Sequence, residues 1–136
     1  MVNRSKNIGT WAESRVVAYL QANDFPNAKR RALAGALDEG DILVCPDVIV
    51  EVKGGHEAEN ASDGQIKAWR TETEKERIHA KVHLAFLVVK RKGHGTLKVG
   101  GWTVVPTENN SELGMLTKFR LDEYVDNFLI PHYGEE

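Results

Sequence analysis

The sequence has no long apolar run and almost no cysteine, and each of these absences excludes a class of protein. No apolar segment approaches the roughly 20 residues that a membrane-spanning helix needs, and the opening stretch MVNRSKNIGTWAES lacks the apolar centre of a secretory signal. The single cysteine, Cys45, can form no internal disulfide and has no second cysteine with which to build a metal cluster. We therefore expect a soluble, cytoplasmic protein whose thiol is buried or lines a turn.

Several common catalytic motifs are missing as well. The five histidines form no HExxH motif and no paired His/Cys spacing, which argues against a zinc site. The stretch GHGTLKVGG leads from one expected strand to another, so it does not predict a phosphate-binding loop at the start of a helix. No serine or cysteine sits in a recognisable nucleophile elbow.

Length and charge distribution limit the remaining possibilities. With 136 residues, 41% of them hydrophobic, the chain suits one domain over 1–136 with its own core. The net charge is −2, but residues 107–136 contain seven Asp or Glu against two Lys or Arg, which leaves 16 basic and 13 acidic residues in 1–106. The basic blocks KRR (29–31) and KRK (90–92) in this mildly basic part could contact phosphates or be ordinary solvated surface.

The hydrophobic periodicity predicts one α/β unit in the order α-β-β-α-β-β-α. The apolar run VHLAFLVVK is typical of a strand covered on both faces, and KGHGTLKVGG (92–101) is expected to be a flexible connection. Helices are predicted at 10–23, 62–80 and in an acidic C-terminal segment at 118–131; strands are predicted at 41–44, 48–53, 82–90 and 101–106, with an extra strand near 27–32.

The stretch GDILVCPDVIVEVKGG (40–55) places charges at the ends of two apolar strands. If these strands form an antiparallel hairpin about the CPD turn, partner numbers sum to 92, so Val44 faces Val48 and Asp41 faces Glu51. Facing carboxylates repel each other, and Lys53 lies on the same face as Glu51 because strand side chains alternate. A hard divalent cation such as Mg²⁺ would compensate this repulsion; the alternative is that the charges are solvated strand ends.

Glu13 adds a third carboxylate on a face that should be buried. It lies on the same helical stripe as Val16 and Leu20, and a buried carboxylate needs a partner or a metal. The alternative is that Glu13 lies at the edge of the stripe and reaches water or pairs with Arg15 or Lys53.

These residues resemble a known family. Asp41, nine intervening residues and then EVK at 51–53 resemble the PD-(D/E)xK nuclease signature, and Glu13 resembles the acid on the first helix of its Holliday-junction-resolvase-like branch. The literal PD, Pro46-Asp47, falls in the expected turn, so we assign the motif aspartate to Asp41.

The resemblance extends beyond the motif. RRALAGALDEGDI, VIVEVKGG, the helix with Trp69 and Glu72, and the strand that runs into VVKRKG are similar to a group of small phage and actinobacterial proteins described as resolvases. The similarity covers about residues 9–106, and the acidic C-terminal helix lies outside it. It implies a restriction-endonuclease-like core, with a mixed central sheet flanked by helices, in a bacterial or phage-infected cell.

What the resemblance implies for the site is a Mg²⁺-dependent endodeoxyribonuclease, with Mn²⁺ as a substitute metal. The metal ligands would be Asp41, Glu51 and the backbone carbonyl of Val52, with Glu13 binding directly or through water. Lys53 would position or activate the attacking water and stabilise charge on the phosphate.

Further residues follow from the same resemblance. Gln65 resembles a polar residue after the core motif, although a glutamine in the first turn of a helix is common. Arg30, Arg31 and Lys90 would contact DNA phosphates. We expect Trp69 and Trp102 in the core or at a subunit interface rather than as base-stacking platforms.

The expected substrate is branched DNA, and the expected assembly is a homodimer, because a four-way junction needs two symmetric incisions. Two alternatives stay open: a structure-specific nuclease for flap, nicked or foreign DNA, and a non-catalytic nucleic-acid-binding protein that retains the nuclease fold.

Overall fold

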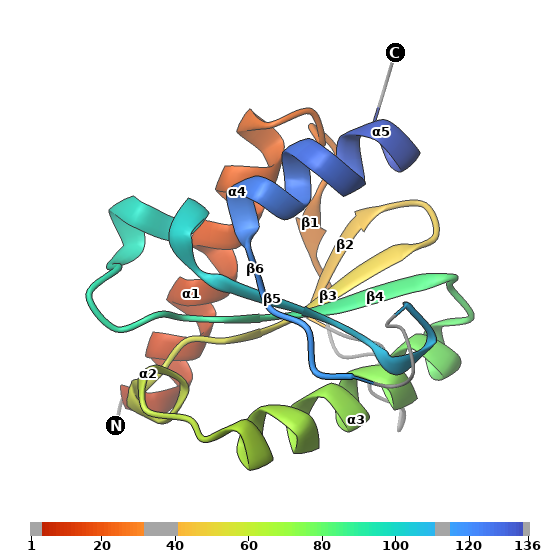
Figure 1. Ribbon diagram of the computed structural model, residues 1–136. Helices are drawn as coiled ribbons and strands as arrows, with labels where there is room; N and C mark the ends of the chain where they lie inside the picture. Colours follow the sequence, from red (N-terminus) through yellow and green to blue (C-terminus); the bar gives the residue numbers. More distant parts are fainter. Residues whose placement is uncertain (1–3, 32–40, 111–114, 135–136) are drawn as a thin grey trace.

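The computed structural model describes residues 4–31, 41–110 and 115–134 and shows a six-stranded mixed sheet with helices on both faces (Figure 1). The helical elements are α1 (Arg4–Ala22), α2 (His56–Glu59), α3 (Asp63–Ala80), η1 (Thr96–Gly101), η2 (Glu108–Asn110), α4 (Leu121–Tyr124), the π-helical η4 (Val125–Leu129) and α5 (Ile130–Tyr133). The strands are β1 (Lys29–Arg30), β2 (Ile42–Cys45), β3 (Val48–Lys53), β4 (Leu84–Val89), β5 (Thr103–Pro106) and β6 (Phe119–Arg120).

The strand order in the sheet follows the chain, from β1 to β6. Neighbouring strands are antiparallel except for β3 and β4, which are parallel and are connected through α2 and α3. A parallel pair needs such a crossover, whereas antiparallel strands can be joined by a short turn. The predicted α/β class and mixed sheet are therefore confirmed, and so is the predicted order α-β-β-α-β-β-α. β1 confirms the extra strand predicted near 27–32, and the structure adds α2 and β6.

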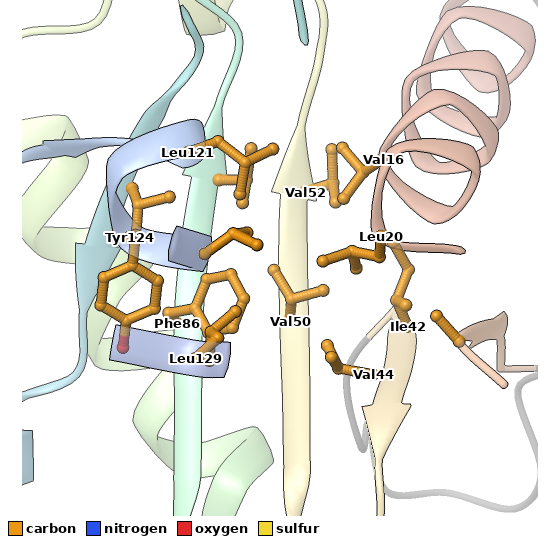
Figure 2. Close-up of a cluster of buried hydrophobic side chains, with 14 of the residues drawn as sticks. Val16, Leu20, Ile42, Val44, Val50, Val52, Phe86, Leu121, Tyr124 and Leu129 are labelled. Carbon is orange, nitrogen blue, oxygen red and sulfur yellow. The ribbon is translucent and has the colours of Figure 1, made fainter. Parts of the chain in front are cut away.

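Two hydrophobic clusters hold the helices on the sheet. The larger cluster joins α1 and α4–η4 to one face, where Val16 and Leu20 meet Val50 and Val52 of β3 (Figure 2). The smaller one joins α2 and α3 to the opposite face through residues such as Trp69 and Leu87. Because both faces are covered, all of β4 is buried, as its apolar run predicts.

The β2–β3 hairpin has most of the predicted register. Ile42 pairs with Val50 and Leu43 with Ile49, as expected. The predicted pair of Val44 with Val48 is wrong, because the register shifts after Leu43 and Cys45 pairs with Val48. The turn is therefore shorter than the predicted CPD turn, and it needs Asp47 at a φ of 78°, a conformation that Asp tolerates better than most residues. Cys45 is half-buried in β2.

The predicted second helix is confirmed, and the structure shows its N-cap. α3 begins after Ser62, whose Oγ accepts a hydrogen bond from the Gln65 backbone N–H at 3.1 Å. It ends at Lys81, which has a left-handed backbone and closes the last turn.

Two predictions for the later part of the chain need correction. The C-terminal helix begins at Leu121 rather than at residue 118, because Phe119 and Arg120 add an edge strand to β5. The connection predicted to be flexible at 92–101 contains the 3₁₀ helix η1, fixed in part by the Trp102 indole, which donates to the His94 carbonyl oxygen at 2.8 Å. No helix within the described ranges combines the length and apolar character needed to cross a bilayer.

Candidate functional site

Four carboxyl side chains from four parts of the fold form a connected row. Glu13 of α1 contacts Asp41, Asp41 shares a hydrogen bond with Glu51 of β3, and Glu51 shares another with Glu76 of α3. Two of these three contacts, those of Glu13 and Glu76, join residues at least 25 positions apart in the sequence, so the tertiary fold brings the carboxyls together. We call Glu13, Asp41, Glu51 and Glu76 the acidic row.

The backbone of the hairpin fixes the centre of the acidic row. Asp41 lies directly before β2, and its Oδ2 accepts a hydrogen bond from the Val52 backbone N–H at 2.9 Å. Glu51 is 6% exposed, because β3 lies inside the sheet and α3 covers its face. The predicted meeting of Asp41 with Glu51 across the hairpin is confirmed, and the shifted pair near the turn leaves it unchanged.

At one end of the acidic row Glu13 is half-buried and has a cationic partner. Its Oε2 lies 3.0 Å from Nη2 of Arg30 in β1. The alternative pairing of Glu13 with Arg15 or Lys53 is therefore not the one adopted, since the Arg15 guanidinium lies over the Trp11 ring. Arg30 neutralises one carboxyl at the edge of the row and leaves the interior carboxyls to one another.

Burial and mutual repulsion make Glu13, Asp41 and Glu51 weak acids. The pKa of Glu13 rises to about 7, mainly through loss of solvation and also through the nearby Asp41, while Arg30 opposes the rise. The pKa of Asp41 rises to about 8 through burial and its contact with Glu51. The pKa of Glu51 rises to about 9 through burial and its contact with Glu76. In the metal-free protein at neutral pH, the interior of the row therefore holds protons.

Lys53 is the basic residue of the motif, and it lies beside the acidic row. It is half-buried at the end of β3, and its ammonium group lies 5.7 Å from the centre of the Trp69 ring. Its positive charge lowers the pKa of Glu51, although less than burial raises it. The predicted alternation is confirmed, since Lys53 faces α3 whereas Val50 and Val52 face α1.

Glu76 is the member of the acidic row that the sequence interpretation missed. It is 6% exposed and lies on the buried face of α3 with Ile66, Trp69 and Thr73, at offsets of ten, seven and three residues. A charge on an apolar helical stripe is the same signal that singled out Glu13. It passed unnoticed because this helix carries many charges along its other faces.

The literal PD dipeptide lies away from the acidic row. Asp47 occupies the turn before β3, at the opposite end of that strand from Lys53, and accepts a hydrogen bond from the His83 backbone N–H at 3.0 Å. This supports the reading of Asp47 as a turn residue and the choice of Asp41 for comparison with the motif.

The other predicted site residues differ in whether they contact the acidic row. The Gln65 side chain is exposed in the first turn of α3, and within the described residues no contact joins it to the row. The Arg31 backbone N–H donates to the Asp41 carbonyl oxygen at 2.8 Å, so this residue does border the row. Lys90 follows β4, where its Nζ forms an ion pair with Oε1 of Glu59 at 2.8 Å.

The donor set of the acidic row fits a hard divalent cation. Its ligand atoms would be carboxylate oxygens, which Mg²⁺ prefers, and Oε2 of Glu51 is buried with no amide, hydroxyl or cationic partner among the described residues. The carboxyls meet in pairs, and in the described ranges no group of three Asp, Glu, His or Cys side chains already surrounds one point. In the metal-free protein, protons between the paired carboxyls offset the repulsion between them, as a bound cation would do for the ionised carboxylates.

Comparisons with models of known protein families, with curated proteins and with solved structures found no match to this chain. The interpretation of the acidic row therefore depends on its own chemistry and on the sequence pattern.

Proposed function

We propose that this protein is a Mg²⁺-dependent endodeoxyribonuclease with a restriction-endonuclease-like core, acting on branched DNA. The observation that carries the proposal is the contact of Glu13, Asp41 and Glu51 beside Lys53 at the end of β3. Buried carboxyls that gain nothing from hydrophobic packing are costly to the fold. Perturbed carboxyls next to a lysine are instead typical of catalytic sites.

In this proposal Asp41 and Glu51 hold the metal, together with the Val52 carbonyl oxygen, and Glu13 binds it directly or through water. Mg²⁺, when bound, supplies a Lewis acid that favours ionisation of a water and balances charge on the phosphate. Lys53 orients that water or stabilises the developing phosphate charge. Glu76 holds Glu51 in position through their shared hydrogen bond.

The direct test is hydrolysis of labelled DNA by the purified protein with Mg²⁺ and with EDTA. We expect Mg²⁺-dependent, Mn²⁺-supported cleavage of four-way junctions, at a higher rate than cleavage of flap, single-stranded and linear duplex DNA of the same sequence. A protein that binds these DNAs without cutting any of them in either metal would be a binding module, and the proposal would be wrong.

A homodimer is part of the proposal, since a four-way junction presents two equivalent phosphates related by two-fold symmetry. Its signature would be paired nicks at symmetric positions of the same junction molecule. A monomer would produce single, unpaired nicks, which would favour a flap or nicked-DNA nuclease with the same metal chemistry.

Arg30→Ala and Arg31→Ala are expected to weaken DNA binding and to flatten its salt dependence. Each phosphate contact contributes about 0.9 to the slope of log K against log salt on duplex DNA, so each variant should lower the slope by roughly one. The two residues flank the acidic row, through the Glu13 ion pair and the Asp41 carbonyl respectively.

The matched control is Lys75→Ala, which removes an exposed cation from the solvent face of α3. Its slope should equal that of the unmodified protein. Equal slopes for the unmodified protein and all three variants would mean that the KRR block is ordinary solvated surface.

A further inference from the structure

The three tryptophans have different environments, and only one of them lies at the surface. Trp102 is fully buried and Trp69 is 7% exposed, so of the two predicted places, core or subunit interface, both lie in the core, whereas Trp11 of α1 is 49% exposed. Single exposed apolar residues are common and need no explanation on their own. Trp11 differs from such residues because it borders a groove beside the acidic row.

The groove is lined by residues of α1 and α2 and by residues that directly follow β3 and β4; Figure 1 shows how these elements are arranged. Its volume is about 170 Å³, several times the roughly 30 Å³ that one water occupies, and it opens to the surface. Trp11, Gly54, Gly55 and Lys90 are among the residues that line it. We call this space the Trp11 groove.

Residues that line the Trp11 groove lie next to the proposed catalytic residues along the chain. Gly54 directly follows Lys53, and Trp11 precedes Glu13 by two positions on α1. The Lys90 backbone N–H donates to the Lys53 carbonyl oxygen at 2.9 Å, which holds the two strand ends together next to Gly54. Residues of the groove lining therefore directly adjoin Glu13 and Lys53 along the chain.

The chemistry of the Trp11 groove suits a flat, uncharged ring attached to a phosphate backbone. Trp11 provides an aromatic face, and the Arg15 guanidinium lies 5.7 Å from the centre of that ring, so a cation accompanies the aromatic surface. Gly55 has no heavy atom within 4 Å of the position that a Cβ would take, so a ligand can approach the backbone there. Aromatic faces next to cations are the usual platforms for unpaired bases.

Building on the proposed nuclease function, we propose that the Trp11 groove binds an unpaired nucleobase by stacking on Trp11. The substrate class is then DNA with an unpaired nucleotide next to the scissile phosphate, as branch points and flaps provide. A base inside a continuous duplex is stacked on both sides and cannot occupy the groove without leaving the helix.

The test measures binding in EDTA, where metal-dependent hydrolysis cannot occur, with fluorescein-labelled oligothymidylate of about 16 nucleotides and a duplex of equal length. Trp11→Ala should weaken oligothymidylate binding about tenfold, since stacking on one aromatic side chain contributes roughly 1–3 kcal/mol per base. Trp11→Phe should retain most of the affinity, and duplex binding should change less than twofold in both variants. Because Trp11 is half exposed, we expect both variants to fold, and thermal unfolding checks this.

A second pair of variants tests the groove itself rather than the tryptophan. Gly55→Leu should fill the groove and weaken oligothymidylate binding, whereas Gly95→Leu should not. Gly95 is a matched control, because it also has open space at its Cβ position and an extended backbone, and it lies at the start of η1 outside the groove.

The outcomes separate this proposal from the nuclease proposal. Selective loss of oligothymidylate binding supports the Trp11 groove even if no DNA is cleaved in Mg²⁺, and cleavage without that selective loss supports the nuclease alone. Unchanged oligothymidylate affinity in Trp11→Ala, or an equal loss for duplex, would overturn the proposal. If Trp11→Ala sediments as a monomer where the unmodified protein is a dimer, and its oligothymidylate affinity is unaltered, the proposal is also overturned. The groove would then be a contact with a second copy of the chain.

Discussion

Asp41→Asn and Glu51→Gln are expected to abolish DNA hydrolysis and at the same time to stabilise the metal-free protein. Each change removes a proposed metal ligand. Mutation of a residue that only supports a metal ligand typically lowers activity about 10- to 100-fold, so the rate should fall by more than that here. Each also removes a buried acid that is forced against another carboxyl. At pH 8 the free energy of unfolding in EDTA should rise by at least about 1.4 kcal/mol, the equivalent of one pKa unit.

The structure explains why these two changes should leave the fold intact. The Asn oxygen at position 41 can still accept the hydrogen bond from the Val52 N–H, and a Gln at position 51 can donate to Asp41 or Glu76. Asp126→Asn is the control, because it removes an exposed carboxylate of the C-terminal helix and should alter neither property. Full hydrolysis by either site variant would refute the assignment, and a large loss of stability would mean that the carboxyls hold the fold together.

The metal-free protein is expected to become less stable as the pH rises from about 5 to about 9. Glu13, Asp41 and Glu51 have raised pKa values of about 7, 8 and 9 in the folded protein, whereas they ionise near pH 4 when unfolded. Between these limits the folded chain holds protons that the unfolded chain has lost, so raising the pH favours unfolding. This stabilising contribution is complete below about pH 4 and is lost as the pH passes through the folded-state values.

Thermal unfolding in EDTA at several pH values measures this effect. One pKa unit corresponds to about 1.4 kcal/mol, and 1 kcal/mol shifts Tm by roughly 4 °C for a chain of this size, so Tm should fall by at least about 5 °C across the range. Mg²⁺ should restore Tm at pH 8, because it binds the ionised carboxylates, and should have little effect at pH 5, where protons compete with it. A Tm that stays level or rises from pH 5 to 9 in EDTA would contradict the account of the acidic row.

Asp41→Asn provides the internal control for the pH experiment. The change removes one of the three titrating carboxyls and takes away a neighbour that raises the pKa of Glu13, so the fall of Tm with pH should be shallower. A slope equal to that of the unmodified protein would show that other groups cause the pH dependence.

The centre of the acidic row was predictable from the sequence because strand geometry is regular. Asp41 and Glu51 lie at the ends of β-branched runs, and alternation with a period of two residues is enough to place both, with Lys53, on one face. The pairing near the turn was not predictable in the same way. Whether a bulge forms at Val44 and Cys45 depends on how the chain reverses at Asp47. The alternation of apolar residues carries no information about the conformation of that turn.

Other parts of the fold were missed because they are too short to show a period. β6 consists of two residues, Phe119 and Arg120, and exists only because β5 offers them a free edge. The contact of Glu51 with Glu76 depends on how α3 crosses the sheet, which is a property of packing rather than of local sequence. The same is true of the Trp11 groove, whose lining residues come from three separate segments.

The order of the strands has a consequence for how the acidic row is assembled during folding. Every strand pairs with its neighbour along the chain, and only the parallel pairing of β3 with β4 requires the closure of a long loop, which runs through α2 and α3. Loop-closure entropy opposes such non-local pairing, while hairpins form readily. Asp41 and Glu51 belong to one hairpin and can meet before the rest of the chain is ordered, whereas Glu13 and Glu76 arrive on helices that dock later. We therefore expect the burial of the carboxyls against one another to be spread over successive steps of folding rather than to occur in a single one.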